Sequence, residues 1–224
     1  MIKTSFENII VSTHLIHRGL AKNKFKENTI NSFKYCFNKN FGIETDLHCT
    51  LDNKIVCFHD FNLKAKFKVN KYISKINYND LKTISNQFRT PIPLLNELIK
   101  ISKNKYYLML EIKPLFSKLN LIKLLKEIKN LKQYSITSFK EKNLIDIYKI
   151  NKKINLGLLI PSTWSIEKIK KKSKLKHVKF LVLEKKFLST KKLDKINKEI
   201  YYYTVKSKKL FVKYKSKNLI FENL

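Results

Sequence analysis

The feature that most constrains the fold is a regular alternation of short apolar segments with longer segments of helical periodicity. The short segments are nearly continuous in apolar character, which is typical of strands covered on both faces. They predict eight strands, at residues 8–16, 41–48, 106–112, 134–137, 154–160, 178–183, 200–205 and 218–221. The longer segments predict helices at residues 28–38, 94–102, 118–129, 141–150, 165–174 and 190–198, with a short one near 207–214. Repeated β-then-α units favour a parallel sheet with helices outside it.

Eight strands with intervening helices predict a closed (β/α)8 TIM barrel, as a single domain over residues 1–224. Such barrels typically contain about 250 residues and can manage with about 200, so this one is expected to be compact. The chain stops at Leu224, soon after the last strand, so the eighth helix is expected to be short or absent. Residues 49–90 form a longer excursion after the second strand. A doubly wound open sheet is the structural alternative.

The net charge of +31, from 48 Lys and Arg residues against 17 Asp and Glu residues, raises nucleic acid or an anionic membrane as a partner. However, Arg18 and Arg89 are the only arginines in the sequence. Arginine supplies the bidentate fork that recognises phosphate and guanine, so a nucleic-acid surface would use more of it. The lysines are spread along the chain among many Asn and Ile residues, and a genome rich in AT codons accounts for that pattern. We therefore expect no specific nucleic-acid partner.

Three cysteines, Cys36, Cys49 and Cys57, are odd in number and show no CxxC spacing. They predict reduced thiols in a cytoplasmic protein rather than a disulfide framework or a zinc site. The sequence contains no run of about 18 apolar residues, so it predicts no transmembrane helix. The first residues also lack the apolar region and cleavage site of a signal peptide.

Rare residues mark the first candidate site. Gly19, one of three glycines, closes the triplet His17-Arg18-Gly19 at the end of the first strand. A glycine permits a tight turn there, with the backbone close to a ligand. Arg18 stands in a chain that otherwise uses lysine, which hints at a need for a planar, bidentate guanidinium.

The second strand carries acidic residues on one face. Strand side chains alternate, so Glu44, Asp46 and His48 share a face, with successive members about 6.6 Å apart, while Ile43 and Leu47 face the helix layer. Two buried carboxylates are costly unless a cation neutralises them. A hard divalent cation with oxygen ligands would do so, and so would a salt bridge to nearby lysines.

Two further pieces lie at strand ends. His59-Asp60 follows a short apolar segment at 54–59, and Glu111-Ile112-Lys113 ends the third strand, with Glu111 and Lys113 on one face. Catalytic groups of a (β/α)8 barrel sit at the carboxyl ends of its strands. His17, Glu44 and Asp46 fall there as well.

Together these residues make the chain resemble the glycerophosphodiester phosphodiesterase family, within the phospholipase C-like phosphodiesterases. The matching elements, in order, are His17-Arg18-Gly19, Glu27-Asn28-Thr29, Gly42-x-Glu44-x-Asp46-x-His48-x-Thr50-x-Asp52, His59-Asp60, Ile92-Pro93-x-Leu95-x-Glu97-Leu98, Glu111-Ile112-Lys113 and Ser138-Phe139. Each motif is weak alone, but their common order and spacing make a specific pattern. The chain departs from it at Lys64-Ala65-Lys66-Phe67-Lys68, where Arg-Thr-Thr is usual, so the resemblance does not define the shape of the site's mouth.

The resemblance implies a metal-dependent phosphoric diester hydrolase that converts glycerophosphodiesters to sn-glycerol 3-phosphate and an alcohol. By that similarity, the metal ligands are Glu44, Asp46 and Glu111, holding Ca²⁺ or Mg²⁺. His17 and His59 are the acid/base pair, in either order, with water or the glycerol 2-hydroxyl as nucleophile.

The resemblance also implies phosphate contacts from Arg18 and Lys113. His48 and Glu27 are candidates for a supporting position near the metal or the mouth, and Trp164 is a candidate for the mouth. His48 and Trp164 are equally consistent with plain core packing. The alternative functions are a phospholipase D-like enzyme acting on lysophospholipids and a basic protein that binds nucleic acid or an anionic membrane.

Overall fold

The computed structural model describes residues 13–224. Of the strand expected at 8–16, residues 8–12 lie outside the described residues. The described part of that strand is β1 (His14–His17).

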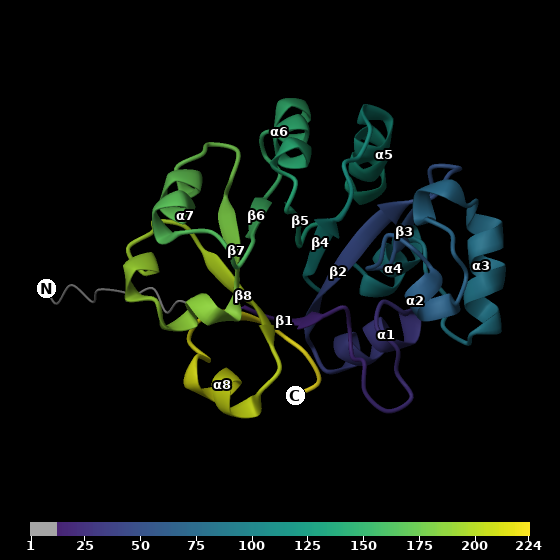
Figure 1. The fold of residues 1–224 in the computed structure, drawn as a ribbon, viewed down its shortest axis with the longest axis horizontal. Coiled ribbons are helices and arrows are strands. Elements are labelled where there is room, and N and C mark those ends of the chain that lie inside the picture. The colour runs from purple at the N-terminus through teal and green to yellow at the C-terminus, as the bar shows by residue number, and fades with distance from the viewer. Residues whose placement is uncertain (1–12) are drawn as a thin grey trace, which may run out of the picture.

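Eight parallel strands close into a barrel (Figure 1). They are β1, β2 (Gly42–Cys49), β4 (Leu108–Ile112), β5 (Tyr134–Ser138), β6 (Leu156–Ile160), β7 (Phe180–Glu184), β8 (Ile200–Val205) and β9 (Asn218–Phe221). β1 pairs in parallel with both β9 and β2, which closes the sheet on itself. The predicted TIM barrel is therefore confirmed, and the open-sheet alternative is wrong.

The helices lie outside the barrel, where Figure 1 shows α5, α6 and α7 side by side around the strands. They are α1 (Ile30–Asn38), α4 (Leu95–Ser102), α5 (Lys118–Ile128), α6 (Glu141–Ile150), α7 (Ile166–Ser173) and the short α8 (Lys208–Lys213). Side-chain oxygens of Thr29, Ser117, Ser165 and Ser207 accept hydrogen bonds from backbone N–H groups at four helix starts. Within the described residues no helix follows β9, as expected for a missing eighth helix.

The helix expected at 190–198 is wrong. The chain instead forms two short 3-10 turns, at Lys185–Ser189 and Lys191–Leu193. Thr190, with extended backbone angles, separates them. Leu193 is the only fully buried residue of the second turn, so the segment lacks the apolar stripe that fixes a longer helix on the barrel.

The excursion after the second strand is a small layer of its own beside β2 (Figure 1). It holds β3 (Ile55–Cys57), which pairs antiparallel with β2, then α2 (Lys64–Phe67), a 3-10 turn at Ile73–Lys75, and α3 (Tyr78–Gln87), a helix that the sequence analysis did not predict. A separate apolar cluster holds it together, made of Val56, Phe58, Leu63, Phe67, Ile73, Ile76, Leu81 and Ile92. This packing gives the loop that carries His59 a fixed base.

The strand pleat divides the core into two layers. Ile43 and Leu47 belong to the large cluster between barrel and helices, as predicted. A second cluster fills the barrel interior with Leu15, Met109, Leu159, Phe180, Val182, Tyr201 and Ile220. This apolar interior forms the floor on which the polar groups at the strand ends rest.

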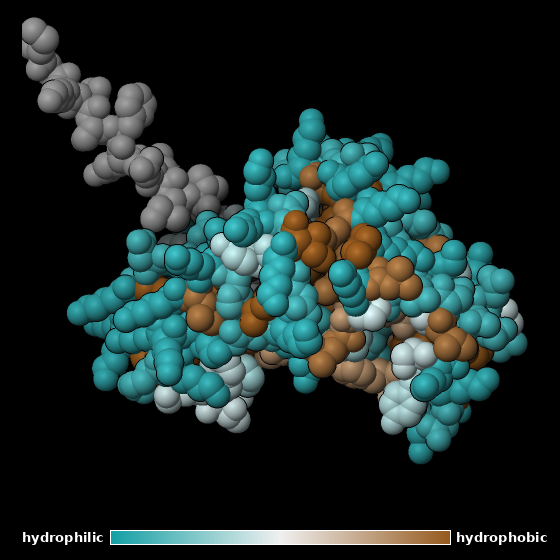
Figure 2. Space-filling model, turned by 90° about the horizontal axis from the view of Figure 1, so that it is seen from above, coloured by the Kyte–Doolittle hydropathy of each residue, from teal (hydrophilic) through white to brown (hydrophobic). Residues whose placement is uncertain are grey.

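The surface is largely hydrophilic on the face that Figure 2 shows, with a small group of hydrophobic side chains near its middle. Within the described residues, no helix combines the length and the apolar character needed to cross a bilayer. The three cysteines are buried and unpaired. Burial raises the pKa of Cys36 to about 11 and that of Cys49 to about 12, which keeps both as unreactive thiols.

We predict that Gly157→Ala in β6 destabilises the barrel. A Cβ at this position would lie 2.3 Å from two ring carbons of Phe180, whose side chain is buried in the barrel interior. Overpacking of this kind costs about 1 to 3 kcal/mol, measurable as a loss of unfolding free energy in urea. Ser162→Ala on an exposed turn is the matched control. Equal stability of the two variants would contradict this account of the interior packing.

Candidate active site

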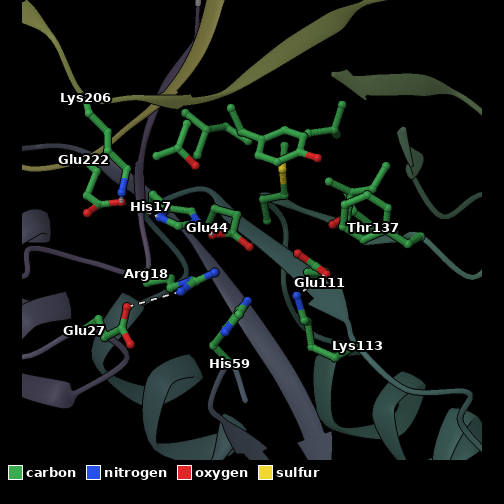
Figure 3. Close-up of a pocket in the computed structure, with 17 residues that line it drawn as sticks. His17, Arg18, Glu27, Glu44, His59, Glu111, Lys113, Thr137, Lys206 and Glu222 are labelled. Carbon is green, nitrogen blue, oxygen red and sulfur yellow. Dashed lines mark hydrogen bonds and ion pairs between the residues drawn. The ribbon is translucent and has the colours of Figure 1, made fainter. Parts of the chain in front are cut away.

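A cavity of 460 Å³ opens at the carboxyl ends of the barrel strands, and polar side chains from strands on opposite sides of the barrel meet in it (Figure 3). Parallel pairing sets their positions, because His17 lies opposite Glu44 and Asp46 lies opposite Glu111 in register. The labelled lining residues are His17, Arg18, Glu27, Glu44, His59, Glu111, Lys113, Thr137, Lys206 and Glu222. Apolar residues of the barrel interior, among them Met109 and Ile220, form the floor.

The turn after β1 aims Arg18 at the acidic strand. Arg18 and Gly19 both adopt positive φ, 54° and 72°, a region that costs a residue with a side chain roughly 1–2 kcal/mol. The turn is held by Arg18 N–H, which donates to the Glu44 carbonyl at 2.8 Å, and by Asn28 N–H, which donates to the Arg18 carbonyl at 2.7 Å. A Cβ on Gly19 would lie 2.4 Å from Ser32 Oγ, so a glycine is needed there.

Asp46 is fully buried beneath the cavity, between two cations. Arg18 Nε lies 3.0 Å from its Oδ2, and Lys113 Nζ lies 3.4 Å from its Oδ1. The amide of Asn28 also donates to Oδ2, at 3.2 Å. Burial by itself would raise the pKa of Asp46, but Arg18 and Lys113 hold that pKa below its ordinary value. Asp46 is therefore the charged anchor of the site.

Glu44 and Glu111 are poised differently. Burial, followed by the charges of Asp46 and Glu111, raises the pKa of Glu44 well above its ordinary value. Burial and Asp46 raise the pKa of Glu111 to about 7, although Lys113 Nζ lies 2.9 Å from Glu111 Oε1. Three carboxylates thus share a region that two side-chain cations neutralise only in part.

His17 is oriented by Glu222, the residue that follows β9, the last strand of the barrel. Its Nδ1 lies 3.1 Å from Glu222 Oε2, and its Nε2 lies 3.9 Å from Glu44 Oε2. This contact lowers the pKa of Glu222 to about 2, with Lys206 adding to the effect from 3.2 Å. Glu222 therefore stays ionised and fixes the ring of His17 with Nε2 toward the cavity.

His59 is held in the same manner by its neighbour. Its Nδ1 lies 2.7 Å from Asp60 Oδ1, and Figure 3 shows its ring pointing into the space between Arg18 and Lys113. Burial lowers the pKa of His59 despite the opposing charge of Asp46. His48 lies behind it, with Nε2 3.1 Å from the His59 carbonyl, and burial lowers the pKa of His48 to about 4. A neutral His48 that donates to this carbonyl supports the backbone of His59.

The carboxylate cluster fits a hard divalent cation. One oxygen from each of Glu44, Asp46 and Glu111 lies within 4.8 Å of the others, and all three residues are buried. Glu44 Oε2 is fully buried and accepts no hydrogen bond from a described residue. Anionic oxygens are the donors that Ca²⁺ and Mg²⁺ prefer, and a dication would relieve the repulsion that raises the two glutamate pKa values.

The structure brings most of the predicted site residues together, and Glu27 joins them by contacts with Arg18 and Lys66 at 3.3 and 3.2 Å. Trp164 does not line the cavity. It packs against the outer core, and Lys168 Nζ lies 4.0 Å from its ring centroid. Sequence reasoning missed the supporting roles of Asn28 and Glu222. The position of Glu222 directly after the last predicted strand could have indicated a role in the site, because functional residues of such barrels lie at the carboxyl ends of strands.

We predict that Glu44→Gln raises the stability of the metal-free protein near pH 7. An acid whose pKa is raised by folding releases its proton more readily when unfolded, so stability falls as pH rises above its unfolded pKa. The wild type should therefore lose about 1 to 3 kcal/mol of unfolding free energy between pH 5 and 7.5 through this cluster, and Glu44→Gln should lose less. Addition of Ca²⁺ should stabilise the wild type more than the variant.

Urea unfolding with a chelator, across that pH range, measures this effect. Asp80→Asn, at an exposed position on α3, is the control because it removes one carboxylate far from the cavity. Parallel pH profiles for wild type, Glu44→Gln and the control would contradict the assignment.

This chain is similar to known proteins of one family. The model of the glycerophosphoryl diester phosphodiesterase family matches residues 17–219, most of the chain. A glycerophosphodiester phosphodiesterase of Caldanaerobacter subterraneus subsp. tengcongensis is 28% identical over 159 residues. That match covers 65% of this chain, and it spans only 65% of the length of the relative.

Solved structures share the fold. A glycerophosphodiester phosphodiesterase from Thermotoga maritima aligns with a TM-score of 0.78 at 21% identity, over 94% of each chain. An Oleispira antarctica phosphodiesterase in complex with the product sn-glycerol-3-phosphate aligns with a TM-score of 0.79 at 20% identity, over 95% of this chain and 93% of that one. With the family model matched across the barrel, the chain belongs to the glycerophosphoryl diester phosphodiesterase family.

Proposed function

We propose that this chain is a phosphoric diester hydrolase that converts glycerophosphodiesters to sn-glycerol 3-phosphate and an alcohol. The observation that carries the proposal is one cavity in which two histidines, each fixed by a carboxylate, face a three-carboxylate cluster and two cations. Membership of the family supports it. The similar phosphodiesterase that holds sn-glycerol-3-phosphate in its structure supports the product class.

Glu44, Asp46 and Glu111 would hold the divalent cation, Ca²⁺ or Mg²⁺. Such a cation would supply charge neutralisation for the phosphate and for the additional charge of the transition state. The residues fit this role because their oxygens are hard donors gathered in a buried space. A bound cation would also leave Arg18 and Lys113 with less of the cluster's negative charge to neutralise.

Arg18 and Lys113 would bind the phosphate oxygens of the substrate. Both side chains line the cavity. Arg18 contacts Asp46 beneath it, and Lys113 contacts Glu111. The guanidinium of Arg18 is held on two sides, by Asp46 and Glu27, so it is already in place when substrate enters. Fixed donors aimed at the phosphate stabilise developing charge without reorganisation.

His17 and His59 would transfer the protons. One deprotonates the nucleophile, either water or the glycerol 2-hydroxyl, and the other protonates the leaving alcohol. Each uses Nε2, because Nδ1 faces a carboxylate in both cases. Glu222 and Asp60 would stabilise the imidazolium that forms on each ring in turn.

Neither alternative function has support of its own in the structure. The residues expected for diester hydrolysis line the cavity together, and the basic surface remains almost purely lysine. The three unpaired cysteines are consistent with the predicted cytoplasmic location, which stays a prediction.

We predict that the purified protein releases sn-glycerol 3-phosphate from glycerophosphocholine, and that a chelator abolishes this activity. His17→Ala and His59→Ala should each lower kcat about 10² to 10⁴-fold, because each removes a positioned proton carrier. His177→Ala, outside the cavity, is the matched control. A coupled assay for sn-glycerol 3-phosphate measures all three. Near wild-type rates for both cavity variants would sink the proposed mechanism.

The pH profile offers a second test. Burial lowers the pKa of His59, and the hydrogen bond with Asp60 acts in the opposite direction and raises it. Asp60→Asn removes the negative charge beside Nδ1, so the pKa of His59 should fall further. The limb of the kcat/KM profile that His59 controls should then move to lower pH. Asp80→Asn should leave the profile in place, and an unmoved limb in Asp60→Asn would remove His59 from proton transfer.

A further inference from the structure

A second, larger cavity of 860 Å³ opens beside the active site and shares His59 and Lys113 with it. We name it the excursion cleft, because its other lining residues come from the layer between β2 and α4. They include Asp60, Phe61, Asn62, Lys64, Lys68 and Tyr72. A diester bound beside His59 and Lys113 would therefore lie at the border between the two cavities.

We propose that the excursion cleft binds the leaving alcohol and favours glycerophosphodiesters whose alcohol carries its own negative charge, such as a phosphorylated polyol. This inference rests on the proposed function and names the substrate class of the same site. Lys64 and Lys68 are its specificity-determining residues.

The sizes of the two cavities indicate which half of the substrate each one takes. Every substrate of the proposed reaction contains the same small glycerol phosphate, and the 460 Å³ cavity among strand-borne polar groups suits that constant part. The alcohol varies in size, and the 860 Å³ excursion cleft at the surface suits it. The cleavable bond would then lie between them, beside His59 and Lys113.

The charges of the excursion cleft indicate which alcohol it favours. Asp60 is its only carboxylate, and Asp60 already faces His59 Nδ1 at 2.7 Å. Lys64 and Lys68 form no ion pair with a described residue, in contrast to Lys66, which lies 3.2 Å from Glu27. Two unneutralised ammonium groups repel choline or ethanolamine and attract a second anionic group.

The remaining lining groups suit a hydroxyl-rich skeleton. Asn62 and Asn70 offer amides at the rim, where Asn62 Nδ2 donates to Asn70 Oδ1 at 3.2 Å. Phe61 and Tyr72 are 48% and 57% exposed, so each presents a ring face against which carbon atoms of a polyol can pack. Lysine, amide and aromatic groups together match a phosphorylated polyol.

The cleft wall is rigid enough to hold this chemistry in place. Leu63 N–H donates to the Lys71 carbonyl at 2.9 Å, and Ile73 N–H donates to the Phe61 carbonyl at 3.0 Å, which ties its two sides together. Leu63 and Ile73 are buried in the excursion's own apolar cluster. The ring of Phe61 meets His48 edge-on at 4.9 Å, and His48 contacts the His59 carbonyl, so the wall is joined to the catalytic loop.

The test compares kcat/KM for glycerophosphoinositol 4-phosphate, glycerophosphoinositol and glycerophosphocholine, measured as release of sn-glycerol 3-phosphate. The wild type should favour the phosphorylated substrate over the unphosphorylated one by about tenfold, equivalent to about 1.4 kcal/mol. Glycerophosphocholine should be the poorest of the three. Raising the salt concentration should reduce the preference, because exposed charges are screened.

Lys64→Gln/Lys68→Gln should reduce the ratio between the two inositol substrates to near one. The matched control is Lys82→Gln/Lys149→Gln, which removes two exposed lysines from α3 and α6, away from the cleft. The control should keep the wild-type ratio, which separates a local effect from that of net charge.

The outcomes distinguish this inference from the proposed function. Hydrolysis of all three substrates with equal kcat/KM, or equal ratios for the cleft variant and the control, would overturn the inference and leave the proposed function standing. Failure to hydrolyse any of the three with Ca²⁺ or Mg²⁺ present would overturn both.

Discussion

The structure depends on one arrangement, a group of three buried carboxylates that Arg18 and Lys113 neutralise only in part. Asp46 lies between both cations, while Glu44 and Glu111 keep raised pKa values. Burial of three carboxylates close together carries a desolvation and repulsion cost. The barrel tolerates this cost because the other faces of β2 and β4 supply Ile43, Leu47, Leu110 and Ile112 to the main core. The repulsion among the three carboxylates is therefore unfavourable in the folded protein, and a bound divalent cation would relieve it.

That arrangement also explains the geometry around it. Arg18 and Lys113, which contact Asp46, face the same cavity that would receive phosphate. The buried carboxylates therefore hold these two cationic side chains in position. The two histidines stand on either side, and each has its own carboxylate partner at Nδ1. Asn28 connects the turn after β1 to both Asp46 and Thr45 with side-chain hydrogen bonds of 3.2 and 2.7 Å. His17, His59 and Arg18 are therefore each held by a neighbouring carboxylate partner rather than by packing alone.

Much of this was predictable because strand alternation and parallel register are strict rules. The alternation on residues 42–48 placed Glu44 and Asp46 on the inner face, and the carboxyl-end rule placed His17, Glu111 and Lys113 beside them. Contacts made by barrel closure were not predictable, since His17 and Glu222 are separated by 205 residues and meet only when β9 pairs with β1. Local propensity also failed at 190–198, where too few buried residues support a helix, and at α3, whose pattern was masked by polar residues. For Trp164 the sequence left the mouth and plain packing equally open, and the structure shows it packed against the main core with Lys168 Nζ over its ring.

The net charge of +31 has a different meaning near the site than elsewhere. Most lysines lie on a solvated surface, where salt screens them beyond about 8 Å at physiological ionic strength. In the excursion, by contrast, Lys64 and Lys68 line the excursion cleft, which shares His59 and Lys113 with the neighbouring cavity. Lys66 lies 3.2 Å from Glu27, whereas Lys64 and Lys68 form no ion pair within residues 13–224. The lysine-rich composition therefore says little about the barrel as a whole. At the excursion cleft it matters more, because a folded wall joined to the loop of His59 holds Lys64 and Lys68 beside the candidate active site.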